Sequence, residues 1–231
     1  TVVISEIMYD PGAGGEYLEL YNSGSNTVDL SWWLLKVGEE SYRLPHGTML
    51  APGSELVIAD TFSTLTNTYA GLNSTNTLES YPVMRIWDWP MAFLSANEYR
   101  TRVVDIPSLT LPNDGATIEI YDICSNLVDV VTYSAVAPWP QTQGAALELV
   151  SADLDNAQPS SWRRSFTGGT PAALNTAGQD LDGDGLIDAW EIQINADIGQ
   201  VAPDGDGDGD MLTNEREYVF GTDPTVDDAG L

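Results

Sequence analysis

Residues 17–21 read Tyr-Leu-Glu-Leu-Tyr, and residues 117–121 repeat the pattern as Thr-Ile-Glu-Ile-Tyr. Apolar and polar side chains alternate in both stretches, which is the period of a half-buried β-strand. Each strand is therefore expected to place one face on a core and the other face in solvent.

The same signals run through the first 170 or so residues. Segments rich in Val, Ile, Leu and Tyr are separated by turn sequences such as Asp10-Pro11-Gly12 and Asn113-Asp114-Gly115. The other strands expected are 2–9, 28–37, 55–59, 128–133 and 146–150. About seven short strands with regular turns predict an all-β, immunoglobulin-like sandwich.

A different pattern begins after the strands. Residues 180–191 read Asp-Leu-Asp-Gly-Asp-Gly-Leu-Ile-Asp-Ala-Trp-Glu and match an EF-hand calcium loop at each diagnostic position, with Gly185 at the sharp turn. The predicted ligands are the carboxylates of Asp180, Asp182, Asp184, Asp188 and Glu191 and the backbone carbonyl of Leu186. Alternating side chains on a tight loop converge on one point, where Ca²⁺ needs six to eight oxygens. The alternative interpretation is an acidic, solvated linker.

Residues 206–217 form a second candidate loop. Its predicted ligands are Asp206, Asp208, Asp210, Asn214 and Glu217, with the backbone carbonyl of Leu212. Met211 occupies the turn position that prefers Gly. A register that begins at Asp204 would put Gly209 at that turn and Glu215 at the last position, but it would leave Leu212 where an oxygen side chain is wanted. The first register keeps more ligands and is preferred, with Asp204 as a spare ligand or a solvated residue.

Helices are expected after the two loops, at 188–196 and 214–220, but not before them. With the run Gly221-Thr222-Asp223-Pro224, this tail resembles the calcium repeats of thrombospondin type 3 and dockerin-like modules. The resemblance implies a rigid module that holds about two Ca²⁺, because calcium sensors use helices on both sides of each loop. The chain thus divides into a sandwich at 1–176 and tandem EF-hand-like repeats at 177–231, so that a small C-terminal calcium-binding loop-helix module follows the β domain.

Several pieces of the strand-rich region occur in a characteristic order. They include Ile4-Ser5-Glu6-Ile7-Met8-Tyr9, Glu16-Tyr17-Leu18-Glu19-Leu20-Tyr21-Asn22, Leu44-Pro45-His46-Gly47-Thr48, Pro138-Trp139-Pro140 and Gly169-Thr170-Pro171 with Asn175. Over residues 2–176 this order resembles the lamin tail domain in the form found in bacterial secreted proteins. The resemblance implies an immunoglobulin-like sandwich without a known catalytic activity that serves as an adhesive or accessory module. Two departures are Trp32, where the family usually has Gly, and a long connection at 61–107.

That connection is rich in aromatic residues and unusually long for a compact domain. Trp87 and Trp89 are the candidate partner-binding residues, by sugar stacking or by contact with a partner subunit. Packing inside the domain is the preferred interpretation, because aromatic side chains usually serve cores first. Asn73-Ser74-Thr75 is an N-glycosylation sequon, a triplet that is common by chance.

Charge and cysteine content restrict the partners and the compartment. The net charge of −27 repels phosphate backbones and disfavours nucleic-acid binding. No apolar run has the length of a membrane span. Cys124 is the only cysteine, so an intramolecular disulfide is excluded; a buried thiol is preferred over an intermolecular disulfide. The chain starts at Thr1 in a strand pattern, and its loops suit the calcium levels outside cells, so secretion is expected.

The sequence holds no convincing catalytic group. His46 is the only histidine, and no Gly-x-Ser-x-Gly motif accompanies it. Glu16 and Glu19 would mimic a glycosidase pair, but a solvated face is preferred in so acidic a chain. A further cation held by Glu6, Glu16 and Glu19 is left open. We expect no enzymatic activity.

These observations favour a secreted, calcium-stabilised structural or adhesive surface protein. One form of this hypothesis is a self-assembling subunit of an extracellular filament or sheath, in which residues 2–9 exchange with a sheet edge of a neighbour. The alternative is a carbohydrate- or cell-wall-binding accessory module of a larger secreted protein. Trp87 and Trp89 in an exposed groove would favour binding of surface glycans or proteins, and the same residues buried between subunits would favour assembly.

Overall fold

The structure is a computed structural model of the 231-residue chain. It describes residues 1–12, 14–60, 65, 68–69, 103–142, 144–165, 168–180, 182–194, 200–220 and 222–227. The candidate residues Trp87, Trp89 and Asn73, with most of the long connection, lie outside the described residues.

The larger sheet has six strands in the order β12-β11-β1-β2-β7-β8. Their bounds are β1 Val2–Met8, β2 Tyr17–Asn22, β7 Glu55–Ala59, β8 Val103–Asp105, β11 Leu147–Leu149 and β12 Trp162–Arg164. Neighbouring strands are antiparallel except for β7 and β8, which run parallel. β1 is paired with β11 on one side and β2 on the other, so exchange of residues 2–9 with a neighbouring subunit would require both pairings within the chain to break.

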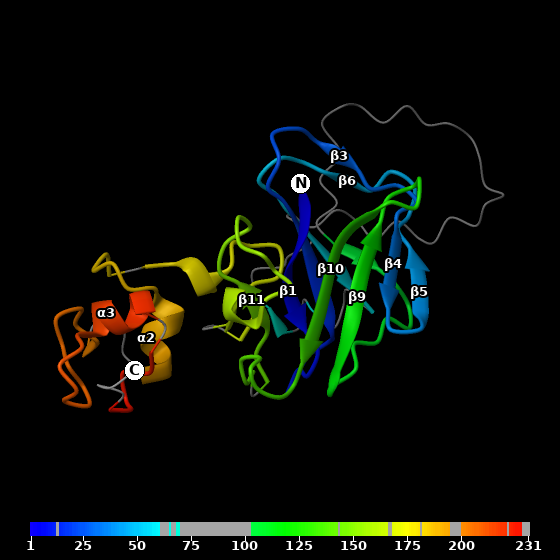
Figure 1. Ribbon diagram of the computed structural model, residues 1–231. Helices are drawn as coiled ribbons and strands as arrows, with labels where there is room; N and C mark the ends of the chain where they lie inside the picture. The colour runs from blue at the N-terminus through cyan, green and yellow to red at the C-terminus, as the bar shows by residue number, and fades with distance from the viewer. Residues whose placement is uncertain are drawn as a thin grey trace.

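The smaller sheet has four strands in the order β10-β9-β4-β5 and faces the larger one (Figure 1). Its strands are β4 Leu34–Val37, β5 Glu40–Arg43, β9 Gly115–Tyr121 and β10 Leu127–Ser134. A separate pair joins β3 Val28–Asp29 to β6 Met49–Leu50. This arrangement of two packed, mostly antiparallel sheets confirms the immunoglobulin-like sandwich that the alternating stretches predict.

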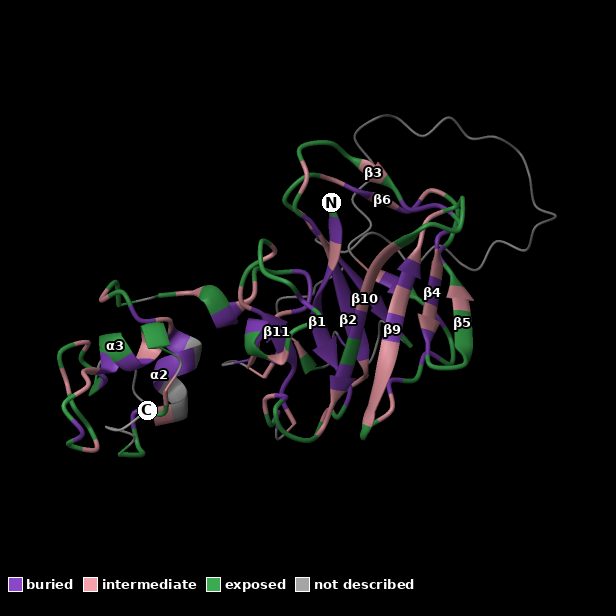
Figure 2. Cartoon of the chain, in the orientation of Figure 1, coloured by how far each residue is buried: buried purple, intermediate pink, exposed green. Residues whose placement is uncertain are grey.

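The core lies between the sheets and draws apolar side chains from both. In Figure 2, buried residues (purple) are prominent along β1 and β2 of the larger sheet. Trp162 is fully buried, and its Nε1 donates a hydrogen bond of 2.8 Å to the Asn156 carbonyl. A polar link also joins the two sheets. The Asp129 carboxylate on β10 accepts the N–H of Ile4 on β1 at 2.6 Å and the side-chain amide of Asn156 at 2.8 Å.

Several strand expectations need correction. The stretch 28–37 is broken between β3 and β4, because Trp32 has a φ of +66° and turns the chain. Strands β5, β6, β8 and β12 were not expected from the sequence. The buried-thiol interpretation of Cys124 is wrong, since this residue is exposed in the turn between β9 and β10.

The tail contains two short helices, α2 Asp188–Ile194 and α3 Asn214–Phe220, after the 3₁₀ turn η2 Thr176–Gly178 (Figure 1). Leu186, Trp190 and Val201 form a small apolar cluster between them, and the rings of Trp190 and Tyr218 lie 5.5 Å apart at their centroids. Residues 195–196, where the first helix was expected to continue, lie outside the described part of the chain. Among the described residues, no helix has the length and apolar character of a membrane span.

Candidate metal centre

The first acidic loop gathers three carboxylates. One oxygen each from Asp180, Asp182 and Asp184 lie within 4.8 Å of one another. The loop is curled by Asp180, whose carboxylate accepts the backbone N–H groups of Gly183 at 2.7 Å and Gly185 at 3.1 Å. Both glycines have positive φ, +75° and +99°, a conformation that other residues adopt only with strain. The backbone therefore favours glycine at position 185, where the calcium-loop pattern has it.

Glu191 completes this arrangement from the first turn of α2. Its side chain is fully buried, and neither carboxylate oxygen accepts a hydrogen bond from the described residues. Burial, followed by the charges of the loop aspartates with Asp182 first, raises the pKa of Glu191 to about 7. A buried carboxylate without a hydrogen-bond donor is costly unless a cation or a proton compensates it. The surroundings of Glu191 thus suit a hard cation.

Two further predicted ligands, Asp188 and Leu186, lie at or just before the start of α2. Asp188 is fully buried at the start of α2, and its N–H donates to the carbonyl of Gln179 at 2.8 Å. Leu186 buries its side chain in the tail cluster and donates its own N–H to Asp184 at 2.9 Å. Burial of the leucine side chain anchors the loop, while its carbonyl is the atom that the loop pattern assigns to the ion.

The second loop repeats this construction. Asp206, Asp208 and Asp210 bring one oxygen each within 4.8 Å of one another. Asp206 accepts the N–H of Gly209 at 2.8 Å and that of Met211 at 3.2 Å, as Asp180 does in the first loop. Leu212 donates to Asp210 at 2.7 Å. The clustered carboxylates are those of the register that begins at Asp206, whereas Asp204 is exposed and lies outside the cluster.

The last two predicted ligands of this loop are on α3. Asn214 is 7% exposed and Glu217 is fully buried. Met211, at the turn position, has a φ of +77°, so a methionine adopts the backbone conformation that Gly185 adopts in the first loop. The second loop therefore has the same shape as the first with added backbone strain.

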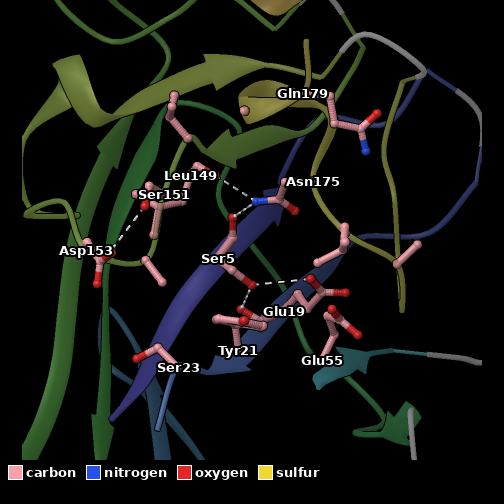
Figure 3. Close-up of a pocket in the computed structure, with 15 residues that line it drawn as sticks. Ser5, Glu19, Tyr21, Ser23, Glu55, Leu149, Ser151, Asp153, Asn175 and Gln179 are labelled. Atoms are coloured by element: carbon pink, nitrogen blue, oxygen red, sulfur yellow. Dashed lines mark hydrogen bonds between the residues drawn. The ribbon is translucent and has the colours of Figure 1, made fainter. Parts of the chain in front are cut away.

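The tail is joined to the sandwich by residues 169–178, which we call the strap. The strap lies on the face of the larger sheet that is turned away from the main core. Asn175 donates from its side-chain amide to the carbonyls of Ser5 at 2.8 Å and Leu149 at 3.0 Å (Figure 3). At Gly178 an added Cβ would lie 2.4 Å from the Val150 carbonyl oxygen, so only glycine fits there. The first acidic loop begins two residues later.

Under the strap lie three glutamates, of which the sequence marks Glu6 and Glu19 as possible ligands of a further cation but does not mark Glu148. Glu6, Glu19 and Glu148 are 0%, 1% and 0% exposed. The expectation that Glu19 belongs to a solvated face is wrong, because the strap covers this face. Burial, followed by the Glu148 charge, raises the pKa of Glu6 to about 8, and burial raises the pKa of Glu19 well above its usual value. Their oxygens accept hydrogen bonds from the protein, which does not favour the further cation site considered for this region.

A polar groove of about 430 Å³ runs beside the strap. Figure 3 shows Ser5, Glu19 and Glu55 on its floor and Asn175 and Gln179 on its strap side. Ser5 Oγ donates to Glu19 Oε1 at 3.2 Å. Among the described residues that line the groove, none is a lysine, an arginine or a histidine.

Comparison with known families gives one match that bears on the fold. A family model described as Lamin Tail Domain matches residues 1–135, from β1 to the end of β10. A comparison with curated proteins gives no match. The matched region ends before β11, the strap and the two acidic loops, so the interpretation of the tail depends on the chemistry of its own residues.

Proposed function

The chain belongs to the lamin tail domain family, and we propose that it is a secreted structural or adhesive protein whose C-terminal tail is made rigid by about two Ca²⁺. The observation that carries this proposal is the buried Glu191 carboxylate, which faces three clustered aspartates and has no hydrogen-bond donor among the described residues. A calcium ion supplies the positive charge that this site otherwise lacks.

The donor set explains the choice of metal. Both loops offer carboxylate, amide and backbone carbonyl oxygens, with neither thiol nor imidazole, and hard oxygen ligands suit Ca²⁺ rather than zinc or copper. The residues that would hold the two ions are Asp180, Asp182, Asp184, Leu186, Asp188 and Glu191 in the first loop, and Asp206, Asp208, Asp210, Leu212, Asn214 and Glu217 in the second. Extracellular modules of this kind bind calcium at the concentrations found outside cells.

A structural role fits the remaining features better than catalysis. The His46 ring lies beside Trp32, at 6.0 Å between centroids.

The tail presents apolar side chains to solvent: Met211, Val219 and Phe220 are 82%, 71% and 67% exposed. Exposed apolar side chains in a highly charged chain favour contact with another protein surface. Because copies with a net charge of −27 repel each other, bound Ca²⁺ would also lower the barrier to self-association.

The test is sedimentation velocity with electron microscopy of the protein in millimolar calcium and then in excess chelator. We expect ordered assemblies in calcium that dissolve in chelator. Glu191→Gln should lose assembly in calcium, and Glu215→Gln, the same change at an exposed carboxyl outside the predicted ligand set, should keep it. Assembly that ignores both chelator and Glu191→Gln would refute the calcium dependence. A monomer in both conditions would refute self-assembly and favour the accessory binding module, to be tested next on glycans and cell-wall material.

A further inference from the structure

Three buried glutamates lie in a row across three neighbouring strands of the larger sheet. Glu6 on β1 is the register partner of Glu148 on β11 and also of Glu19 on β2. Directly opposed like charges destabilise a sheet. Burial makes the repulsion stronger, because the surrounding dielectric is low. Such a row is stable only if some of its charge is compensated.

The strap supplies the hydrogen-bond donors for this row. Thr170 donates its N–H to Glu6 Oε1 at 2.7 Å, and Ala172 donates its N–H to Glu19 Oε2 at 2.7 Å. Glu148 Oε2 accepts the Thr176 hydroxyl at 2.8 Å and the Ala177 N–H at 2.7 Å. Each of the three carboxylates is thus bonded to the strap, and these bonds hold the strap on the sheet.

The Thr170 hydroxyl shows how the charge is shared. Its Oγ1 lies 3.3 Å from Glu6 Oε2 and 3.1 Å from Glu148 Oε1. A hydroxyl has one hydrogen to donate, but its oxygen also accepts. Both contacts become hydrogen bonds when one of the two carboxyl groups is protonated and donates to Thr170 while the other accepts from it. With both carboxylates ionised, one contact becomes a repulsion between oxygens.

The other charged and titratable groups around this row do not provide a counter-charge. Tyr17 donates its hydroxyl to Glu6 Oε1 at 2.6 Å, and Tyr69 lies against Tyr17. Glu55 on β7 adds negative charge near Glu19. Arg163 on β12 is the register partner of Glu148, but its guanidinium donates to the carbonyls of Ser160 and Trp162. Among the described residues, the ion pair found is Lys36 with Glu119, on the smaller sheet.

We propose that the strap is a proton-dependent clasp, in which one proton shared by Glu6 and Glu148 through Thr170 holds residues 170–177 on the sheet and loss of that proton releases them. The tail follows the strap directly, so the clasp also decides whether the tail is fixed to the sandwich. This device is independent of calcium binding. It acts on the joint between the two parts of the chain rather than on either loop.

The direction of the pH dependence follows from the raised pKa of Glu6. A pKa raised in the docked state means that protonation favours docking. The contribution is present in full below the ordinary value of 4.5 and is lost as the pH rises through about 8. We therefore expect a docked strap in mildly acidic to neutral solution and a released strap in alkaline solution.

The test is hydrogen–deuterium exchange of the full chain in millimolar calcium, with rates corrected for intrinsic exchange. For residues 170–177 we expect protection to fall about tenfold or more between about pH 6.5 and about pH 9.5, while β9 keeps its protection. Glu6→Gln imitates the protonated acid, since its amide donates to Thr170, and it should keep the strap protected at both pH values. Glu148→Gln also places an amide donor next to the Thr170 hydroxyl, and it should likewise keep the strap protected at both pH values.

Glu40→Gln, an exposed carboxyl on β5, is the matched control and should follow the parent protein. The clasp is refuted if the parent strap stays equally protected at high pH. It is also refuted if the folded Gln variants lose strap protection at the same pH as the parent. Both results would leave the calcium proposal untouched, because neither substitution removes a predicted calcium ligand.

Discussion

Asp188 donates its backbone N–H to the carbonyl of Gln179 over 2.8 Å, which ties the start of α2 to the residue that precedes the first acidic loop. Asn214 makes the same bond to Gly205 in the second loop, also at 2.8 Å. Each loop is therefore closed at its base by the helix that follows it. This closure explains how each loop is held in shape although the described residues just before it, 168–179 and 200–205, form no α-helix.

The two loops differ most at the turn, where Gly185 is replaced by Met211. Because Met211 has positive φ and its side chain is 82% exposed, its strain is not offset by packing. We expect Met211→Gly to strengthen calcium binding at the second loop by about 1 kcal/mol, roughly fivefold. Calorimetric titration of the parent and the variant measures this change.

Met211→Ala is the control, because alanine removes the side chain but keeps the unfavourable backbone conformation. It should bind calcium like the parent. An equal gain from Ala and Gly would mean that the methionine side chain, and not the backbone, limits the site.

A second prediction concerns the pH dependence of the first loop. The pKa of Glu191 is raised to about 7 by burial and by the surrounding aspartates, and calcium requires the ionised form. Binding must then release a proton below this pH, so affinity should fall by about tenfold between about pH 8 and about pH 6. Terbium luminescence excited through Trp190 reports this loop in a Glu217→Gln background, where the second loop is disabled. A flat affinity over this range would show that Glu191 is already ionised in the calcium-free protein.

The sequence predicts the local parts of this structure better than the long-range ones. The acidic loops and the bounds of α3 can be predicted because they depend on the order of residues within one short stretch of the chain. Strands at 55–59 and 117–121 follow from β-propensity and alternation. The burial of Glu6 and Glu19 could not be predicted in this way, because the cover comes from the strap, which is more than 150 residues away in the chain. Alternation identifies two faces of a strand, but it does not say what covers each face.

Trp32 is a residue that the sequence marks as unusual but whose backbone conformation the sequence does not predict. It stands where the family usually has Gly, and its φ of +66° gives the physical reason. We expect Trp32→Gly to be more stable than Trp32→Ala by about 1 kcal/mol, the reverse of the usual order, because alanine keeps the left-handed strain. Urea unfolding of both variants measures the difference. Equal stabilities would mean that the chain relaxes at this turn.

The last prediction concerns the polar link between the two sheets. Asp129 accepts hydrogen bonds from the Ile4 N–H at 2.6 Å and from the Asn156 side chain at 2.8 Å, in a half-buried position. Asp129→Ala would leave both donors without this acceptor inside the sandwich. Because an unsatisfied buried donor carries its full desolvation cost, we expect the free energy of unfolding to fall by about 1–3 kcal/mol. Asp153→Ala, at an exposed aspartate, should change it by less than about 0.5 kcal/mol. If the two variants unfold at the same urea concentration, the hydrogen bonds of Asp129 do not contribute measurably to the stability of the sandwich.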